Sequence, residues 1–215
     1  MSRITTTGYA LLGLIASRSF STYELTRWMR WSNLRALWPR AESQIYKEPK
    51  VLNAEGLAEV EVEYQGERKR TIYRATPEGR AALADWLDEP SDRFHYRYEA
   101  AVKVAFANHG SIDALRTTLR AVVLEAEDDA AQMLDVARGH ADQMSPVPER
   151  EHLNALVDGL ILEIIEARLR WARDAERRIA DWDATTASDE RAEEARQLWS
   201  DYERRLTALL ADREG

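Results

Sequence analysis

The positions of apolar residues divide the chain into a mixed N-terminal part and a nearly all-helical C-terminal part. Near the N-terminus, apolar residues recur at helical spacing, and serine or threonine residues that can cap a helix precede several of these segments. Val60, Val62 and Tyr64 alternate with glutamates, which predicts a strand with one buried and one solvated face. The pattern predicts helices over residues 5–17, from 21 or 22 to a break at Trp38-Pro39, over 40–54 and over 77–87, and a hairpin with strands at 58–64 and 70–75.

After residue 90 the pattern becomes nearly unbroken helix, with helices predicted over residues 94–108, 112–143, 149–183 and 188–213. In the last three of these, apolar residues step by three and four, the spacing of a coiled-coil seam. Helices of about 33 residues extend about 50 Å at ~1.5 Å per residue and need partners to cover their apolar stripes. A symmetric dimer supplies such partners, so we expect a homodimer. The candidate interface residues are Leu153, Val157, Leu160, Ile164, Trp171, Trp199 and Leu206.

The order helix, helix, helix, two-stranded hairpin is that of a winged helix-turn-helix. In this module the third helix enters the major groove of double-stranded DNA, and the hairpin reaches the backbone or the minor groove. Glutamine pairs with adenine edges, serine donates or accepts, and lysine and arginine contact phosphate or guanine. The third predicted helix and the hairpin tip carry these residue types, and the candidate DNA-binding residues are Arg40, Ser43, Gln44, Lys47, Lys50, Arg68, Lys69 and Arg70.

The charge distribution favours different partners for the two parts of the chain. The net charge is −8, but residues 1–84 carry a net charge of +4 and the remainder carries −12. A locally positive region is what a polyanion meets. The chain has no cysteine, which excludes disulfides, thiolate nucleophiles and zinc fingers. The first residues lack the pattern of a signal peptide, and no apolar run approaches the ~20 residues of a membrane span, so we expect a soluble, cytoplasmic protein.

Other classes of function find less support in the residues. An enzyme is not expected, because the nine glycines form no phosphate-binding loop or nucleophile elbow. One Glu-x-x-His stands at Glu149–His152, whereas a di-iron bundle needs two, so we expect no metal site and no cofactor. The overall negative charge keeps one rival open, a winged helix that mediates protein interaction without binding DNA. The seven tryptophans could line an aromatic ligand slot, or Trp171 and Trp199 could simply fill the dimer seam.

Five segments in order resemble the PadR family of transcription regulators. They read GYALLGLI at residues 8–15, STYEL at 21–25, SQIY at 43–46, LNAEGL at 52–57 and RTIYRATPEGRAAL at 70–83. The resemblance covers residues 7–90, and the helical remainder is similar in kind to the longer subgroup with a virulence-activator-like C-terminal domain. It implies a mainly α fold, with an N-terminal winged helix-turn-helix domain over residues 1–90 and a long-helix dimerisation and effector domain over 91–215.

The resemblance also implies a function. It points to a homodimeric regulator, usually a repressor, that binds a palindromic operator and is often released by a small apolar or aromatic effector. It implies that Tyr23 and Tyr46 contact the DNA backbone or support the helices. For Tyr46 the alternative is a ring packed on the first helix with only its hydroxyl exposed. Tyr73 is expected in the core. Pro49 departs from the family pattern, and because proline lacks an amide hydrogen we expect a kink or a short third helix.

Overall fold

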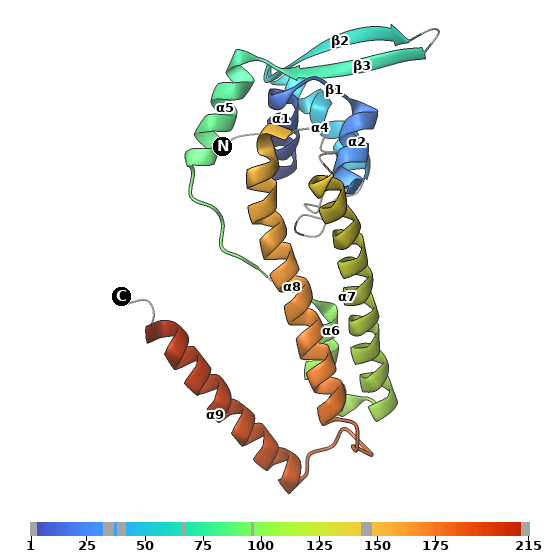
Figure 1. Ribbon diagram of the computed structural model, residues 1–215, viewed down its shortest axis with the longest axis vertical. Helices are drawn as coiled ribbons and strands as arrows, with labels where there is room; N and C mark the ends of the chain where they lie inside the picture. Colours follow the sequence, from blue (N-terminus) through green and yellow to red (C-terminus); the bar gives the residue numbers. More distant parts are fainter. Residues whose placement is uncertain are drawn as a thin grey trace. The chain divides into compact units, whose positions relative to one another are not determined.

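The computed structural model describes residues 4–31, 37, 42–65, 68–95, 97–142 and 148–211. It is mainly helical with a small antiparallel sheet, which confirms the predicted fold class (Figure 1). The chain divides into two compact units, residues 1–95 with 127–167, and residues 96–126 with 168–215. Among the described residues, no helix is long and apolar enough to span a membrane. The elements are α1 (Thr6–Ser17), β1 (Phe20–Ser21), α2 (Thr22–Trp31), α4 (Glu42–Ala54), β2 (Ala58–Gln65), β3 (Arg68–Ala75), α5 (Pro77–Asp88), α6 (Glu99–Ala105), η1 (Ala107–His109), α7 (Ile112–Ala141), η2 (Pro148–Arg150), α8 (Glu151–Arg178) and α9 (Asp189–Ala211).

Local signals set the ends of the N-terminal helices. Thr5 caps α1, and its side-chain oxygen accepts a hydrogen bond from the amide of Gly8 at 3.1 Å. Thr76 caps α5 in the same way, and Pro77 occupies the first turn. α4 ends at Ala54, and the φ of 74° at Gly56 lets the amide of Leu57 bond back to the carbonyl of Leu52 at 2.8 Å. These helix ends lie where the sequence predicts them.

The sheet has the strand order β1-β3-β2. β2 and β3 form the predicted hairpin, and β1 is a short third strand that the sequence pattern does not reveal. β1 pairs only with Tyr73 and Ile72, whereas β2 and β3 pair from Ala58–Ala75 out to Gln65–Arg68. The far part of the hairpin therefore projects past the third strand, as Figure 1 shows. We call this far part, residues 61–65 and 68–71, the projecting wing.

One prediction about the hairpin is wrong. Val60, Val62 and Tyr64 were expected to form a buried face, yet all three side chains are exposed. They alternate with glutamates as expected, but the helices do not extend under the projecting wing. The hairpin residues that belong to the apolar core of the domain, Tyr73 and Ala75 of β3 and Ala58 of β2, lie at its base, and the neighbouring Ile72 is buried as well.

Helices α1, α2, α4 and α5 enclose one apolar core with the base of the sheet. Leu11, Leu12, Leu14 and Ile15 of α1 are fully buried. The ring of Trp86 in α5 stacks on Tyr9 of α1, with centroids 4.7 Å apart and planes 3° apart. The other buried members of this core are Phe20, Leu25, Met29, Ile45, Leu52, Ala58, Tyr73 and Ala75. This core fixes α4 against α1 and α2.

In the second unit, the first half of α7 packs against the last part of α8, and Figure 1 shows these segments side by side. Leu115 and Leu119 form one cluster with Ile179, and Val122 and Val123 form another with Ala172. The apolar seam of the first half of α7 is thus covered within the chain. α6 is shorter than predicted, because residues 94, 95, 97 and 98 are not helical and the helix begins only at Glu99.

Candidate nucleic-acid interface

One side of α4 is buried in the core of the domain. Ile45, Pro49 and Leu52, at spacings of four and three, are the buried residues of this side. Of the two outcomes expected at Pro49, a kink or a short helix, the structure contradicts the second, because α4 continues to Ala54. The proline is tolerated because its ring is fully buried among core side chains, where the packing supports the helix.

Polar contacts anchor α4 to its neighbours. The Thr5 hydroxyl, which caps α1, also donates to Glu48 Oε1 at 3.0 Å. Near the end of α4, Asn53 Nδ2 donates to the carbonyl of Ala58 at 2.8 Å, which ties the helix to the start of β2. These contacts link α4 to the start of α1 and to β2.

The opposite side of α4 is exposed and basic. Lys47 and Lys50, three residues apart, are exposed. Tyr46 keeps 44% of its surface exposed, more than a hydroxyl alone, which favours a contact with a partner over a ring packed on α1. Tyr23, in the first turn of α2, is also exposed, and Tyr73 is buried in the core as predicted. Ser43 and Gln44 lie in the first turn of α4 with side chains outside the described residues, and Arg40 lies outside them entirely.

The projecting wing carries the second basic cluster. Arg68 and Lys69 lie on β3 close to the tip, and their side chains are outside the described part of the structure. Arg70 is half-buried, and its Nη2 contacts Glu24 Oε2 on α2 at 3.1 Å. The guanidinium of Arg70 thus already has a carboxylate partner.

Glu24 closes the N-terminus of α2 together with Ser21. The Ser21 amide donates to Glu24 Oε2 at 2.8 Å, and the Glu24 amide donates to Ser21 Oγ at 3.2 Å, a reciprocal capping box. Partial burial acts to raise the pKa of Glu24, but the hydrogen bonds from Ser21 and the charge of Arg70 outweigh it and lower the pKa below the usual range. The Ser-x-x-Glu spacing signals this cap in the sequence, whereas nothing local signals the link to Arg70.

Strand β2 limits where a polyanion can approach. Glu59, Glu61 and Glu63 are exposed along it, and within the described part of the chain they form no ion pair. Their negative charge repels phosphate. The part of β2 that carries these glutamates is therefore an unfavourable surface for a polyanion.

A different surface of the chain is apolar and exposed along α8. Of the predicted interface residues on this helix, Leu153, Leu160 and Trp171 are exposed, and Val157 and Ile164 are half-buried. The buried residues of α8 lie one position further along, at Ile161, Ile165 and Ala172. The sequence analysis missed this second row, which has the same helical spacing.

Helix α9 buries none of its described residues. Its exposed apolar side chains include Trp199, Tyr202, Leu206, Leu209 and Leu210. A helix stripe of this kind is stable in water only when another apolar surface covers it. Trp199 and Leu206, predicted to lie in a dimer seam, thus belong to a continuous uncovered stripe.

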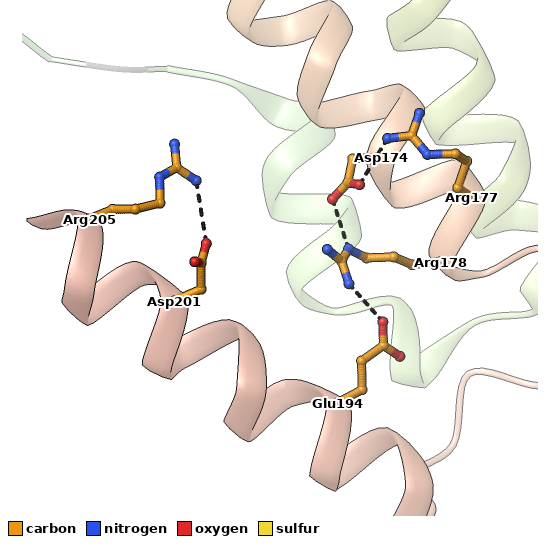
Figure 2. Close-up of polar contacts among 6 residues, drawn as sticks. All are labelled: Asp174, Arg177, Arg178, Glu194, Asp201 and Arg205. Atoms are coloured by element: carbon orange, nitrogen blue, oxygen red, sulfur yellow. Dashed lines mark hydrogen bonds and ion pairs between the residues drawn. The ribbon is translucent and has the colours of Figure 1, made fainter.

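An arginine on α8 links that helix to the start of α9 (Figure 2). Arg178 Nε contacts Asp174 Oδ2 at 2.8 Å, and its Nη1 contacts Glu194 Oε1 at 2.9 Å. The hydrogen bonds to Asp174 and then to Glu194 raise the pKa of Arg178, and the bond from Arg178 lowers the pKa of Asp174. Arg191 of α9 pairs with Asp183 at 3.0 Å and covers the ring of Trp182. The first turns of α9 are thereby held while its apolar stripe stays open.

Comparisons with known proteins agree with this geometry. Residues 20–91 match the family described as a winged helix DNA-binding domain. Over 80 residues the chain is 35% identical to the negative transcriptional regulator PadR of Bacillus subtilis strain 168, an alignment of 37% of this chain and 43% of that protein. The match thus spans less than half the length of that curated relative.

Solved structures extend the likeness to most of the fold. B. subtilis PadR in complex with operator DNA gives a TM-score of 0.71 at 22% identity, over 81% of this chain and 99% of that one. The same protein in complex with p-coumaric acid gives 0.61 at 22% identity, over 84% and 99%. The virulence activator AphA of Vibrio cholerae gives 0.61 at 21% identity, over 81% and 98%.

The fold and the family match assign residues 20–91 to the class of winged helix DNA-binding domains. The curated relative that matches this domain is a negative regulator of transcription. Over the 80 aligned residues, this chain is similar to that PadR regulator.

Proposed function

We propose that this PadR-like chain is a homodimeric transcriptional repressor that binds palindromic operator DNA in the cytoplasm. The observation that carries the proposal is the two-sided character of α4. One side is buried through Ile45, Pro49 and Leu52, and the other exposes Lys47 and Lys50. That is the arrangement of a recognition helix, which must be fixed to the domain and free toward the groove.

Each candidate residue then has a chemical role. Ser43 and Gln44 read base edges, because hydroxyl and amide groups form hydrogen bonds that distinguish bases. Tyr23 and Tyr46 donate their hydroxyls to the DNA backbone. The residues that neutralise phosphates are Arg40, Lys47, Lys50, Arg68 and Lys69. We assign DNA binding to residues 1–90 and dimerisation and effector response to residues 91–215.

The dimer rests on the uncovered stripe of α9 and the exposed residues of α8. A second copy of the chain offers the same stripes, and a two-fold axis lets each α9 cover a partner surface. Leu153, Leu160, Trp171, Trp199 and Leu206 lie in this interface, with Val157 and Ile164 at its edge. Two-fold symmetry in the protein requires a matching palindrome in the operator.

We further propose that a small aromatic molecule releases the repressor from DNA. B. subtilis PadR has been solved in complex with p-coumaric acid, a flat aromatic acid, as well as with operator DNA. A ligand of that chemical class fits a protein with seven tryptophans, since aromatic rings stack on one another.

Fluorescence anisotropy tests DNA binding. A labelled duplex from upstream of the protein's own gene is titrated beside a random duplex at roughly 50 and 200 mM salt. Tighter binding to the upstream duplex, with an affinity that falls by orders of magnitude at the higher salt, supports an autoregulating repressor. Equal salt-sensitive binding to both places the operator elsewhere. No binding to either duplex at low salt refutes DNA binding and favours a protein-interaction module.

A further inference from the structure

The projecting wing has one point of attachment to the helices. β1 stops at Ser21, opposite Ile72, so residues 68–71 of β3 have only β2 beside them. Arg70 lies in this stretch and reaches back to the N-terminus of α2. Within the part of the chain that the structure describes, no other side-chain hydrogen bond or ion pair links the projecting wing to a helix.

The attachment is a network of three side chains. Arg70 Nη2 donates to Glu24 Oε2 at 3.1 Å and to Ser21 Oγ at 3.4 Å, while the Ser21 hydroxyl donates to the same carboxylate oxygen at 2.7 Å. The side chains of Arg70 and Glu24 are each only 35% exposed, so the pair is partly withdrawn from water. Glu63 stands directly opposite Arg70 on β2, yet Arg70 pairs with Glu24 instead.

We infer that Arg70 is a positioning residue that sets the direction of the wing relative to α2, rather than a residue that binds phosphate. This inference rests on the proposed DNA binding and deepens it. The guanidinium of Arg70 has its charge neutralised by Glu24, so it is not available to neutralise a phosphate. Glu24 thereby becomes a residue on which DNA affinity depends, although its own charge opposes DNA.

The sign of one substitution separates the two roles. Glu24→Gln removes a negative charge, so electrostatics alone would tighten binding to DNA. If the pair holds the wing, the same substitution weakens binding by roughly two- to five-fold, the range typical of a partly exposed ion pair. Glutamine keeps the hydrogen bonds of the capping box, so the start of α2 is preserved. Glu63→Gln is the matched control, since it removes the same charge from the wing without breaking the pair.

The experiment measures anisotropy with upstream and random duplexes over a range of salt for wild type, Glu24→Gln, Arg70→Gln, the double variant, Glu63→Gln and Lys69→Gln. We expect Glu24→Gln and Arg70→Gln to weaken binding to a similar extent, the double variant to be no weaker than either, and Glu63→Gln not to weaken it. The slope of log affinity against log salt concentration should stay unchanged in Arg70→Gln. In Lys69→Gln this slope should become shallower by about 0.9 per protomer, because each protomer loses one phosphate contact. Tighter binding by Glu24→Gln, or a flatter salt slope in Arg70→Gln, overturns the inference.

A measurement without DNA separates this inference from the proposed function. Amide hydrogen exchange at residues 62–65 and 68–71 should be faster in Glu24→Gln than in wild type and unchanged in Glu63→Gln. If wild type binds no duplex, DNA binding fails but the exchange result still decides whether the pair holds the wing. Equal exchange in wild type and Glu24→Gln overturns the positioning role.

Discussion

Replacing Trp199 by alanine tests whether a second copy of the chain covers α9. Trp199 is 71% exposed in the single chain. A buried aromatic side chain removes ~150–250 Å² from water, so covering Trp199 removes roughly 100–180 Å² in each protomer. At ~25 cal/mol per Å² this contributes about 2.5–4.5 kcal/mol per protomer and about 5–9 kcal/mol per symmetric dimer. Since ~1.4 kcal/mol is a factor of ten, the dissociation constant of the dimer should rise by roughly 10³-fold or more in the Trp199→Ala variant.

Sedimentation velocity over a range of protein concentrations measures this change. Tyr64→Ala is the matched control, because Tyr64 on the wing strand is also 71% exposed but lies outside α8 and α9. We expect wild type and Tyr64→Ala to sediment as dimers at concentrations where Trp199→Ala sediments as a monomer. A Trp199→Ala protein that dimerises as tightly as wild type, or a monomeric wild type, would refute the assignment of α9 to the interface.

Three further predictions concern the winged helix domain. Gly79→Ala should destabilise the protein by about 1–3 kcal/mol in urea unfolding, because the added Cβ would lie 2.0 Å from the carbonyl oxygen of Leu57. Gly13→Ala is the control and should be neutral or stabilising, since its Cβ would have nothing within 4 Å, and equal effects of the two substitutions would contradict the packing. The pKa of Glu24 is lowered in the folded state, so its contribution to stability is present above the usual value of 4.5 and is lost as the pH falls through the folded pKa. The difference in free energy of unfolding between wild type and Glu24→Gln should therefore shrink on acidification below pH 4.5, and a difference that grows would reverse the sign. Gln44→Ala should cost ~1–3 kcal/mol on the operator and little on random DNA, and undiminished discrimination would show that Gln44 does not read bases.

The ends of the helices follow from the sequence because the signals that set them are local. Thr5 and Thr76 cap the residues that directly follow them, and Gly56 adopts its positive φ because it has no side chain. The chemical types expected at a DNA interface also come from sequence alone, as for Lys47 and Lys50, which the structure leaves exposed.

The features that escaped the sequence pattern depend on residues far apart in the chain. β1 has two residues and exists only because Tyr73 and Ile72 pair with it across some fifty positions. The bond from Arg70 to Glu24 spans a similar separation. From the sequence alone, a basic residue near a hairpin tip is therefore predicted to bind phosphate, because its carboxylate partner is not identifiable there.

On α8 the difficulty was a choice between two adjacent rows of apolar residues. Leu153 and Leu160 stand beside Ile161 and Ile165, and both rows have helical spacing. Which row is covered within the chain is decided by the element packed against it, and periodicity alone does not identify that element.

Selection of binding sites from a pool of randomised duplexes tests DNA recognition by the dimer most directly, because it needs no knowledge of the operator. Two recognition helices related by a two-fold axis should enrich a palindrome whose half-sites lie about 10–10.5 base pairs apart, or a multiple of that distance. Loss of the palindrome's consensus at single positions in the Gln44→Ala protein would place α4 in the groove. Recovery of no sequence, or of one asymmetric half-site, would contradict a dimeric winged helix regulator.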